Sequence, residues 1–419
     1  MACAYAPGRL RRWRQCSSMY TYTPLLAAAL VGLASVCQGF LRPIGPLSAT
    51  SRQVFFGPMA ASSAASCRAD ARLHMRWGFR RKNKAEEFPT AKSRVKLGGL
   101  KVSPMGIGTW AWGNKLVWGY DEAMDEELQS AFNLCIDQGI NWFDSADSYG
   151  TGKIVGQSER LLGKFIREYP GKPSVRDDIR IATKFAPYPT RLGAESIIQA
   201  CEETLERLQR PVLDVGQLHW APPLGWQETR YWQGLAELVL AGQVREVGLS
   251  NYGPQRLGQA HHFLLRRGAP LASNQVQFSL LSRYPLYNGL FEATKDLGVT
   301  NIAYSPLALG LLTGKYNPWN VPSGPRGLLF RQLLPSMGPL LGVMGAIAGE
   351  REKTMAQVVA INWTIAKGTV PIVGVKSVAQ ARENLGALGW LLTNAEVEEL
   401  DRVARLVKDQ TVQNIFQSK

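Results

Sequence analysis

Apolar runs and helix-periodic stretches alternate along the chain from Val95 onward. Each run is rich in Val and Ile and is followed by a stretch of helical periodicity, which is the pattern of a parallel sheet built from βαβ units. The pattern predicts eight strands, at residues 104–109, 140–144, 179–185, 213–219, 244–250, 272–278, 300–305 and 370–374. It predicts helices at residues 125–138, 158–169, 194–209, 226–241, 255–267, 289–297, 356–367, 379–388 and 395–406.

This order predicts an α/β fold, a single (β/α)8 TIM barrel over residues 95–419 with an extra C-terminal helix. Eight strands with intervening helices is the count of that fold, and no Pro/Gly/Ser-rich linker divides the segment. Residues 94–103, with Gly98 and Gly99 between two alternating segments, predict an N-terminal β-hairpin at the bottom of the barrel. The connection 307–350 is rich in Pro and Gly, and a loop of that length is usually functional or disordered.

The first 94 residues differ in amino-acid composition from the rest of the chain. Arginines precede an apolar run at 25–36 and small residues follow it, which predicts a signal peptide over residues 1–39 and no stable membrane anchor. Residues 40–94 are rich in Ser, Ala and Arg, the composition of a transit peptide and a disordered leader. Together they resemble the bipartite leaders of algae with complex plastids, and predict the chloroplast stroma. The alternative is a secreted protein with a disordered pro-segment.

The distribution of charge and of cysteines excludes several classes of function. The formal charge is +15, but residues 1–94 hold fifteen Lys and Arg against three acids, which leaves thirty-three against thirty in the rest. Residues 95–419, called the body below, are therefore nearly neutral, which excludes nucleic acid as the partner of this part of the chain. Only Cys135 and Cys201 lie in the body, which favours a reducing compartment over a disulfide framework. Neither cysteine has metal-ligand spacing, so no metal is expected.

Titratable residues stand at the carboxyl ends of three successive strands, where a barrel of this kind builds its active site. Asp144 and Tyr149 follow the second strand, Lys184 ends the third and His219 ends the fourth. Each alone fits a structural role, such as a solvated strand end or a satisfied core histidine. Together they predict one proton-transfer site.

The expected chemistry is general acid catalysis by Tyr149. A tyrosine with a pKa of ~10 is a poor acid at neutral pH, and a buried ammonium at Lys184 should lower that pKa. Asp144 supplies the opposite charge that keeps Lys184 ionised, and His219 orients a carbonyl oxygen. Asp147 has no part in this mechanism and is interpreted as loop structure.

A group that protonates oxygen needs a second reactant to attack carbon, and a hydride donor is the best candidate. Ser250, Asn251 and Gln275 offer groups that suit a carboxamide, and Tyr304 could stack on a flat nicotinamide ring. Lys376 and its neighbours lie before a helix, where amides and an ammonium favour an extra phosphate, which points to NADPH. The body has no Gly-x-Gly-x-x-Gly fingerprint, so a Rossmann site is not supported.

At this point the body resembles the aldo-keto reductases. The matching motifs are Gly108-Thr109-Trp110, the run 143–150, Thr183-Lys184, Leu218-His219-Trp220, the run 248–251, Asn274-Gln275-Val276, the run 304–307 and the run 374–377. The resemblance implies a catalytic tetrad of Asp144, Tyr149, Lys184 and His219. It implies that NADPH is held by Ser250, Asn251, Gln275, Tyr304, Ser305, Leu307, Lys376, Ser377, Gln380 and Asn384.

Three further motifs, at 108–113, 156–163 and 383–390, look more narrowly like the plastid members of plants and algae. Some relatives of that group reduce pyridoxal, so a small carbonyl compound is expected as substrate, with Trp110, Trp112, Trp118 and Trp220 as candidate pocket walls. Packing is the alternative role for each tryptophan. The alternative function is an NADPH-binding regulatory subunit with little turnover.

Overall fold

The computed structural model describes residues 88–407 and Ser418, apart from 153–154, 223–224 and 356–359. The signal peptide and nearly all of the transit segment predicted above therefore lie outside the described residues.

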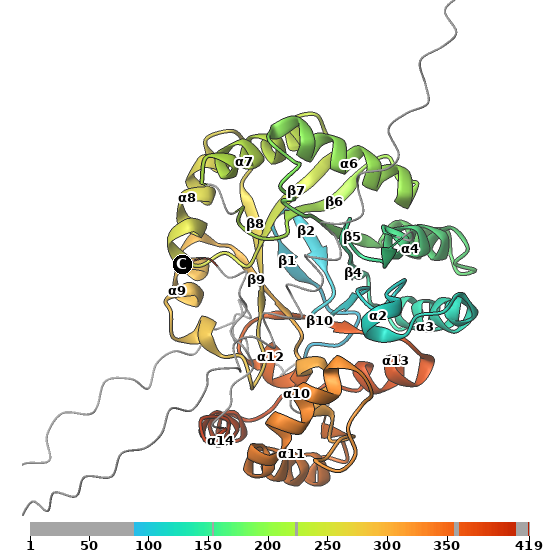
Figure 1. Cartoon of the computed structure of the whole chain (residues 1–419), viewed down its shortest axis with the longest axis vertical. Coiled ribbons are helices and arrows are strands. Elements are labelled where there is room, and N and C mark those ends of the chain that lie inside the picture. Colours follow the sequence, from blue (N-terminus) through green and yellow to red (C-terminus); the bar gives the residue numbers. More distant parts are fainter. Residues whose placement is uncertain (1–87, 153–154, 223–224, 356–359, 408–417, 419) are drawn as a thin grey trace, which may run out of the picture. The chain divides into compact units, whose positions relative to one another are not determined.

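Eight parallel strands form a closed barrel, as the alternating pattern predicted (Figure 1). Neighbours follow chain order, and β10 closes the ring by pairing with both β3 and β9. The strands are β3 (Gly106–Gly108), β4 (Trp142–Asp144), β5 (Arg180–Phe185), β6 (Leu213–Leu218), β7 (Val244–Ser250), β8 (Leu271–Gln277), β9 (Thr300–Tyr304) and β10 (Val370–Gly374).

Helices follow the strands close to the predicted positions, with one exception. They are α3 (Asp125–Asp137), α4 (Gln157–Arg167), α6 (Ala194–Leu208), α7 (Gly225–Leu240), α8 (Pro254–Leu265), α9 (Leu290–Leu297), α12 (Trp363–Ala366), α13 (Val378–Leu385) and α14 (Asn394–Ala404). Of the helix predicted at residues 356–367, residues 356–359 lie outside the described residues and α12 covers only the last part. Local chemistry sets several of the ends. Thr393 and Glu396 form a capping box at the start of α14, and Pro254 occupies the first turn of α8, where no backbone N–H is needed. The short helices α2 (Lys115–Trp118) and α5 (Pro173–Asp177) have too few periodic positions to be predicted.

The predicted hairpin is present as β1 (Val95–Leu97) and β2 (Leu100–Val102), which pair antiparallel. Its apolar face joins a buried cluster inside the barrel that includes Trp142 and Val370, the first residues of two strands. At its turn, Gly99 donates a backbone hydrogen bond of 2.7 Å to Glu246 of β7. The hairpin thus closes the amino-terminal end of the barrel and leaves the carboxyl ends of the strands for chemistry.

The connection between β9 and β10 corrects the expectation of a long loop. It holds η4 (Ala308–Thr313), α10 (Pro325–Leu333), η5 (Leu334–Ser336) and α11 (Gly338–Glu350). Phe330, Met337 and Met344 bury their side chains in the main core, so the apolar content that obscured periodicity is what anchors this segment. Of its helices, α11 lies beside α14 (Figure 1).

Within the described part of the chain, no single helix is long and apolar enough to cross a membrane. The bent pair Arg326–Ser336 and Gly338–Glu350 meets the length and composition test only when its two helices are taken together.

Candidate active site

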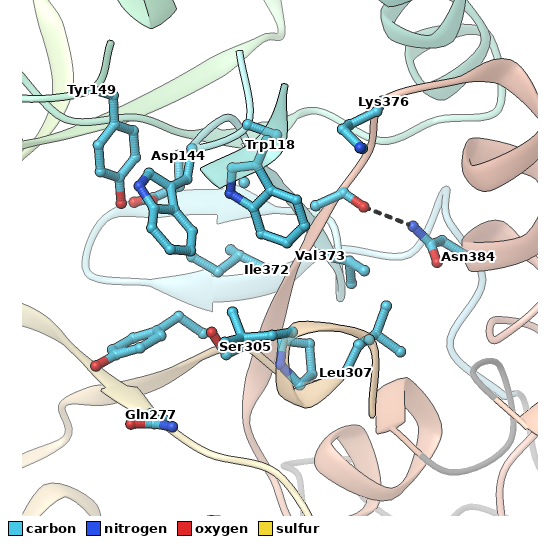
Figure 2. A pocket seen from close by; sticks show the side chains of 18 of the residues that line it. Trp118, Asp144, Tyr149, Gln277, Ser305, Leu307, Ile372, Val373, Lys376 and Asn384 are labelled. Carbon is cyan, nitrogen blue, oxygen red and sulfur yellow. Dashed lines mark hydrogen bonds between the residues drawn. The ribbon is translucent and has the colours of Figure 1, made fainter. Parts of the chain in front are cut away.

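A cavity of about 610 Å³ opens at the carboxyl ends of the strands. Figure 2 shows Asp144 and Tyr149 at one end of it, Lys376 and Asn384 at the other, and Trp118 between them. The cavity is therefore elongated, with the predicted proton-transfer group and the predicted phosphate-binding group at opposite ends.

Lys184 is the centre of the proton-transfer group. It is only 1% exposed, and its Nζ donates hydrogen bonds to Asp144 Oδ1, to the Ser145 carbonyl at 2.8 Å and to Tyr149 Oη at 3.3 Å. Asp144 ends β4 and Lys184 lies on the adjacent β5, so parallel pairing brings them together. Tyr149 reaches the same point through the turn after β4, as the sequence predicted.

The electrostatics of this group differ from the expectation in one respect. Burial raises the pKa of Tyr149, and although Lys184 lowers it, the net shift is upward. The expected net lowering is therefore wrong for this structure, because desolvation of the phenolate outweighs the nearby ammonium. Burial opposes the charge on Lys184, but Asp144 and Tyr149 favour it, and the pKa of Lys184 is raised. The site thus holds a neutral phenol beside a charged ammonium.

His219 follows β6 and faces the same space. Its ring centroid lies 5.9 Å from that of Tyr149 and 4.7 Å from that of Trp220. Burial, and secondly Lys184, lower its pKa well below the ordinary value. Its Nδ1 is buried without a hydrogen-bond partner among the described residues. The imidazole is therefore neutral and has hydrogen-bonding capacity to spare.

Asp147, which the sequence left out of the mechanism, joins two loops beside this site. Its carboxylate accepts a hydrogen bond of 2.5 Å from Arg191 and weaker ones of 3.3 Å from the Ala186 amide. Burial raises the pKa of Asp147 to about 6, against the opposing effect of Arg191. Its own backbone N–H donates to the Lys184 carbonyl. These contacts fit the structural role predicted for it.

The predicted cofactor-binding residues from β7, β8 and the end of β9 all line the cavity: Ser250, Asn251, Gln275, Tyr304, Ser305 and Leu307. Asn251 is fixed on both sides, because its Nδ2 donates to the His219 carbonyl at 3.1 Å and its Oδ1 accepts from Tyr304 Oη at 3.0 Å. Asn251 and Ser305 both have positive φ, which turns the chain sharply where each strand ends.

At the far end, Lys376, Gln380 and Asn384 line the cavity, and Ser377 does not. Ser377 instead caps α13 by accepting from the Gln380 amide. Asn384 donates to the Gly374 carbonyl at 3.4 Å (Figure 2).

Trp112 corrects another prediction. It is fully buried, its indole N–H donates to the Val375 carbonyl at 2.8 Å, and it packs against Phe165, so it is a core residue. Trp110, Trp118 and Trp220 do line the cavity. The turn after β3 directs Trp110 toward the cavity and Trp112 into the core. The sequence does not show this difference, because both residues are tryptophans in the same short motif.

Several cavity residues were not predicted. Arg326 of α10 lies over Trp118 at 4.7 Å, and Lys376 lies over the same indole at 5.4 Å. Lys315, which pairs with Glu383 at 2.8 Å, and Tyr316 also line the cavity. The signal for Lys315 was available, since it follows the 304–307 motif closely. Arg326 lies in the apolar segment whose periodicity was unreadable.

Comparison with known proteins agrees with this geometry. Residues 104–405 match the aldo/keto reductase family. The chain is 53% identical over 330 residues to the chloroplastic pyridoxal reductase of Arabidopsis thaliana, covering 78% of this chain and 90% of that protein. It is 29% identical over 341 residues to an L-glyceraldehyde 3-phosphate reductase of Escherichia coli O157:H7, covering 76% and 93%.

Solved structures share the fold. A thermostable aldo-keto reductase, Tm1743, solved with the inhibitor epalrestat, is 28% identical with a TM-score of 0.59, covering 74% of this chain and 99% of that one. An aldo/keto reductase from Klebsiella pneumoniae, solved with NADP and acetate, is 25% identical with a TM-score of 0.57, covering 75% and 95%. With the closed barrel and the family match over most of its length, the chain belongs to the aldo/keto reductase family.

Proposed function

We propose that this protein reduces the carbonyl group of small aldehydes and ketones to alcohols with NADPH, that Tyr149 is the general acid, and that pyridoxal is a substrate. The observation that carries the proposal is the buried group in which Lys184 contacts both Asp144 and Tyr149. Such a group moves one proton at one oxygen, which is what carbonyl reduction requires of a protein.

The cavity fits a long anionic cofactor. Lys376 and Arg326 share one indole at the end opposite Tyr149. Burial, and secondly Arg326, lower the pKa of Lys376, so two cations are held close together at some electrostatic cost. A phosphate between them would relieve that cost, and the two charges favour a cofactor with an additional phosphate.

At the other end, Ser250, Asn251 and Gln275 would hold the carboxamide of the nicotinamide, with Tyr304 against its ring. When bound there, NADPH supplies the hydride for the carbonyl carbon.

The protein's own residues perform the proton transfer. Tyr149 Oη gives its proton to the substrate oxygen, and the ammonium of Lys184 stabilises the phenolate that remains. Asp144 keeps Lys184 charged against the cost of burial. His219, being neutral, has an N–H with which to orient the carbonyl oxygen toward Tyr149 without competing as an acid.

Aromatic walls support a flat substrate. Trp110 and Trp220 line the cavity, and Trp220 lies beside His219. Stacking on these indoles suits a ring-bearing aldehyde. The relative named as a pyridoxal reductase supports pyridoxal as the first compound to try.

The test is to mix the protein with NADPH and a panel of aldehydes that includes pyridoxal, and to follow NADPH absorbance. We expect oxidation of NADPH with pyridoxal or another aromatic aldehyde, and much slower oxidation of NADH. NADPH that binds without oxidation, whatever carbonyl compound is added, would favour a regulatory subunit instead.

We further propose that the protein works in the plastid stroma. The chloroplastic relative supports this, and Cys135 and Cys201, both free and buried, suit a reducing compartment. Fusing residues 1–94 to a fluorescent protein should direct it to plastids, and secretion of the fusion would contradict the proposal.

A further inference from the structure

Different groups hold the two carboxylate oxygens of Asp144. Oδ1 accepts from Lys184. Oδ2 accepts from two amides, Gln217 Nε2 at 3.0 Å and Gln275 Nε2 at 2.8 Å. A carboxylate held by donors from β5, β6 and β8 is fixed in rotation as well as in position.

The two glutamines are not equivalent. Gln275 lines the cavity, but Gln217 is not among the described residues that do so. Gln217 is fully buried on β6, in register with Lys184 on one side and Gly248 on the other. It therefore touches Asp144 from within the barrel and has no route to a bound ligand.

The orientation of the Gln217 amide follows from its partner. A carboxylate only accepts hydrogen bonds, so the NH₂ group must face Asp144. This leaves Gln217 Oε1 buried with no hydrogen-bond partner in the described part of the chain. Such an oxygen costs stability that an apolar side chain of the same length would not cost. Packing alone therefore does not explain a glutamine here.

The neighbouring strand makes room for this side chain. A Cβ added to Gly248 would lie 2.7 Å from Cγ of Gln217 and 2.7 Å from Oγ of Ser273. Both contacts are closer than real Cβ atoms allow, so a larger residue at 248 would displace the glutamine.

We propose that Gln217 is a positioning residue for proton transfer, which holds Asp144 by Oδ2 so that Oδ1 faces Lys184. The proposal rests on the proposed function, since it assigns Gln217 a role in the same reaction. Its effect reaches Tyr149 through charge. Burial, and next Lys184 and Asp144 in opposite senses, set the pKa of that phenol. A donor on Asp144 spreads the negative charge that Tyr149 meets.

Gln217→Met tests this, because methionine keeps the length and removes the donor. Without the donor the negative charge of Asp144 acts more strongly on Tyr149 and raises its pKa. Reduction needs the protonated phenol, so the basic limb of the kcat profile should move to higher pH, by less than the ~1–3 units that a whole neighbouring charge contributes. KM should be unchanged, since Gln217 touches no ligand. Gly248→Ala, which displaces the same side chain, should shift the limb in the same direction.

The matched control is Gln199→Met. Gln199 is an exposed glutamine on α6 that also donates to a carboxylate, Glu203 at 3.0 Å, and its replacement should leave the profile unmoved. If Gln217→Met lowers kcat equally at every pH, the positioning role is wrong and the residue is merely structural.

A second readout needs no turnover. Urea unfolding of the wild type, Gln217→Met, Asp144→Asn and the double variant forms a cycle. We expect the effect of Gln217→Met on the unfolding constant to differ by about tenfold between the two backgrounds. Additive effects would overturn the proposal. A wild type that reduces no carbonyl compound would defeat the proposed function and the role of Gln217 in proton transfer with it. If the wild type is active, additive effects in the cycle overturn the proposal for Gln217 alone, because they show that it does not hold Asp144.

Discussion

At the scale of the residue, the site depends on one neutral phenol beside one charged ammonium. Removing the Tyr149 hydroxyl with Tyr149→Phe leaves the ring and removes the proton. We expect kcat to fall by about 10²–10⁴-fold, the usual worth of a positioned general acid. NADPH binding, measured by fluorescence quenching, should persist. Wild-type turnover in this variant would assign the proton to another group.

His219 makes stability depend on pH. Its pKa in the folded protein lies well below the ordinary value of 6.5 because it is buried. Below pH 6.5 the His219 side chain of the unfolded chain binds a proton that the folded chain does not bind. The contribution of His219 to the free energy of unfolding is therefore complete above pH 6.5 and is lost as the pH falls.

Between pH 6.5 and 5, the free energy of unfolding should fall less steeply in His219→Gln than in the wild type, by up to about 1.4 kcal/mol per pH unit, as measured by urea unfolding. The control is His262→Gln, which changes an exposed histidine on α8. Equal slopes in all three proteins would show that His219 is not the source.

At this scale the sequence was most informative about residues at strand ends. Asp144, Lys184 and His219 lie where parallel strands deliver them, and that position follows from the alternating pattern alone. Trp112 was misassigned because the direction of a side chain in the turn after β3 depends on tertiary packing. Gln217 lies within the predicted strand 213–219, but nothing in the sequence shows that its amide meets Asp144.

At the scale of the element, α10 brings Arg326 to the cavity. Arg326→Ala should weaken NADPH binding by about tenfold, since a charge-assisted contact to phosphate is lost. Arg331→Ala, which removes an exposed arginine from the same helix, is the control for general charge. Equal dissociation constants for NADPH in both variants would remove Arg326 from the cofactor site.

The hairpin turn offers a stability test. Gly98 and Gly119 both have positive φ, +57° and +65°. A Cβ at Gly98 would lie 2.2 Å from the Glu246 carboxylate, whereas at Gly119 it meets nothing within 4 Å. Gly98→Ala should therefore lower unfolding free energy by about 1–3 kcal/mol more than Gly119→Ala does. Equal losses would show that Glu246 simply moves aside.

Apart from the helix expected at 356–367, elements with a clear period were predicted within a few residues, and the segment 308–350 was not. Its helices are short or apolar on most sides, so no polar face marks their period. The positions of its buried side chains depend on the core they enter, which is information that lies in other parts of the chain.

At the scale of the whole molecule, the described residues contain a complete barrel and its cavity. We expect a protein that begins at residue 88 to match the full chain in kcat and in melting temperature. Because the excess positive charge lies in residues 1–94, the shorter protein should also elute earlier from a cation-exchange column. An inactive or unfolded product would show that the first 87 residues serve the barrel.

The hydrogen bonds to Asp144 also affect which strand pairings are stable when the chain folds. Donors from three other strands converge on this one carboxylate. A slip of one residue in any of these strands turns its donor to the opposite face, and a buried charge that loses a partner costs several kcal/mol. Mispaired barrels are therefore penalised at the point where the reaction occurs. The same hydrogen bonds that prepare the site for proton transfer therefore stabilise the correct strand register over shifted ones.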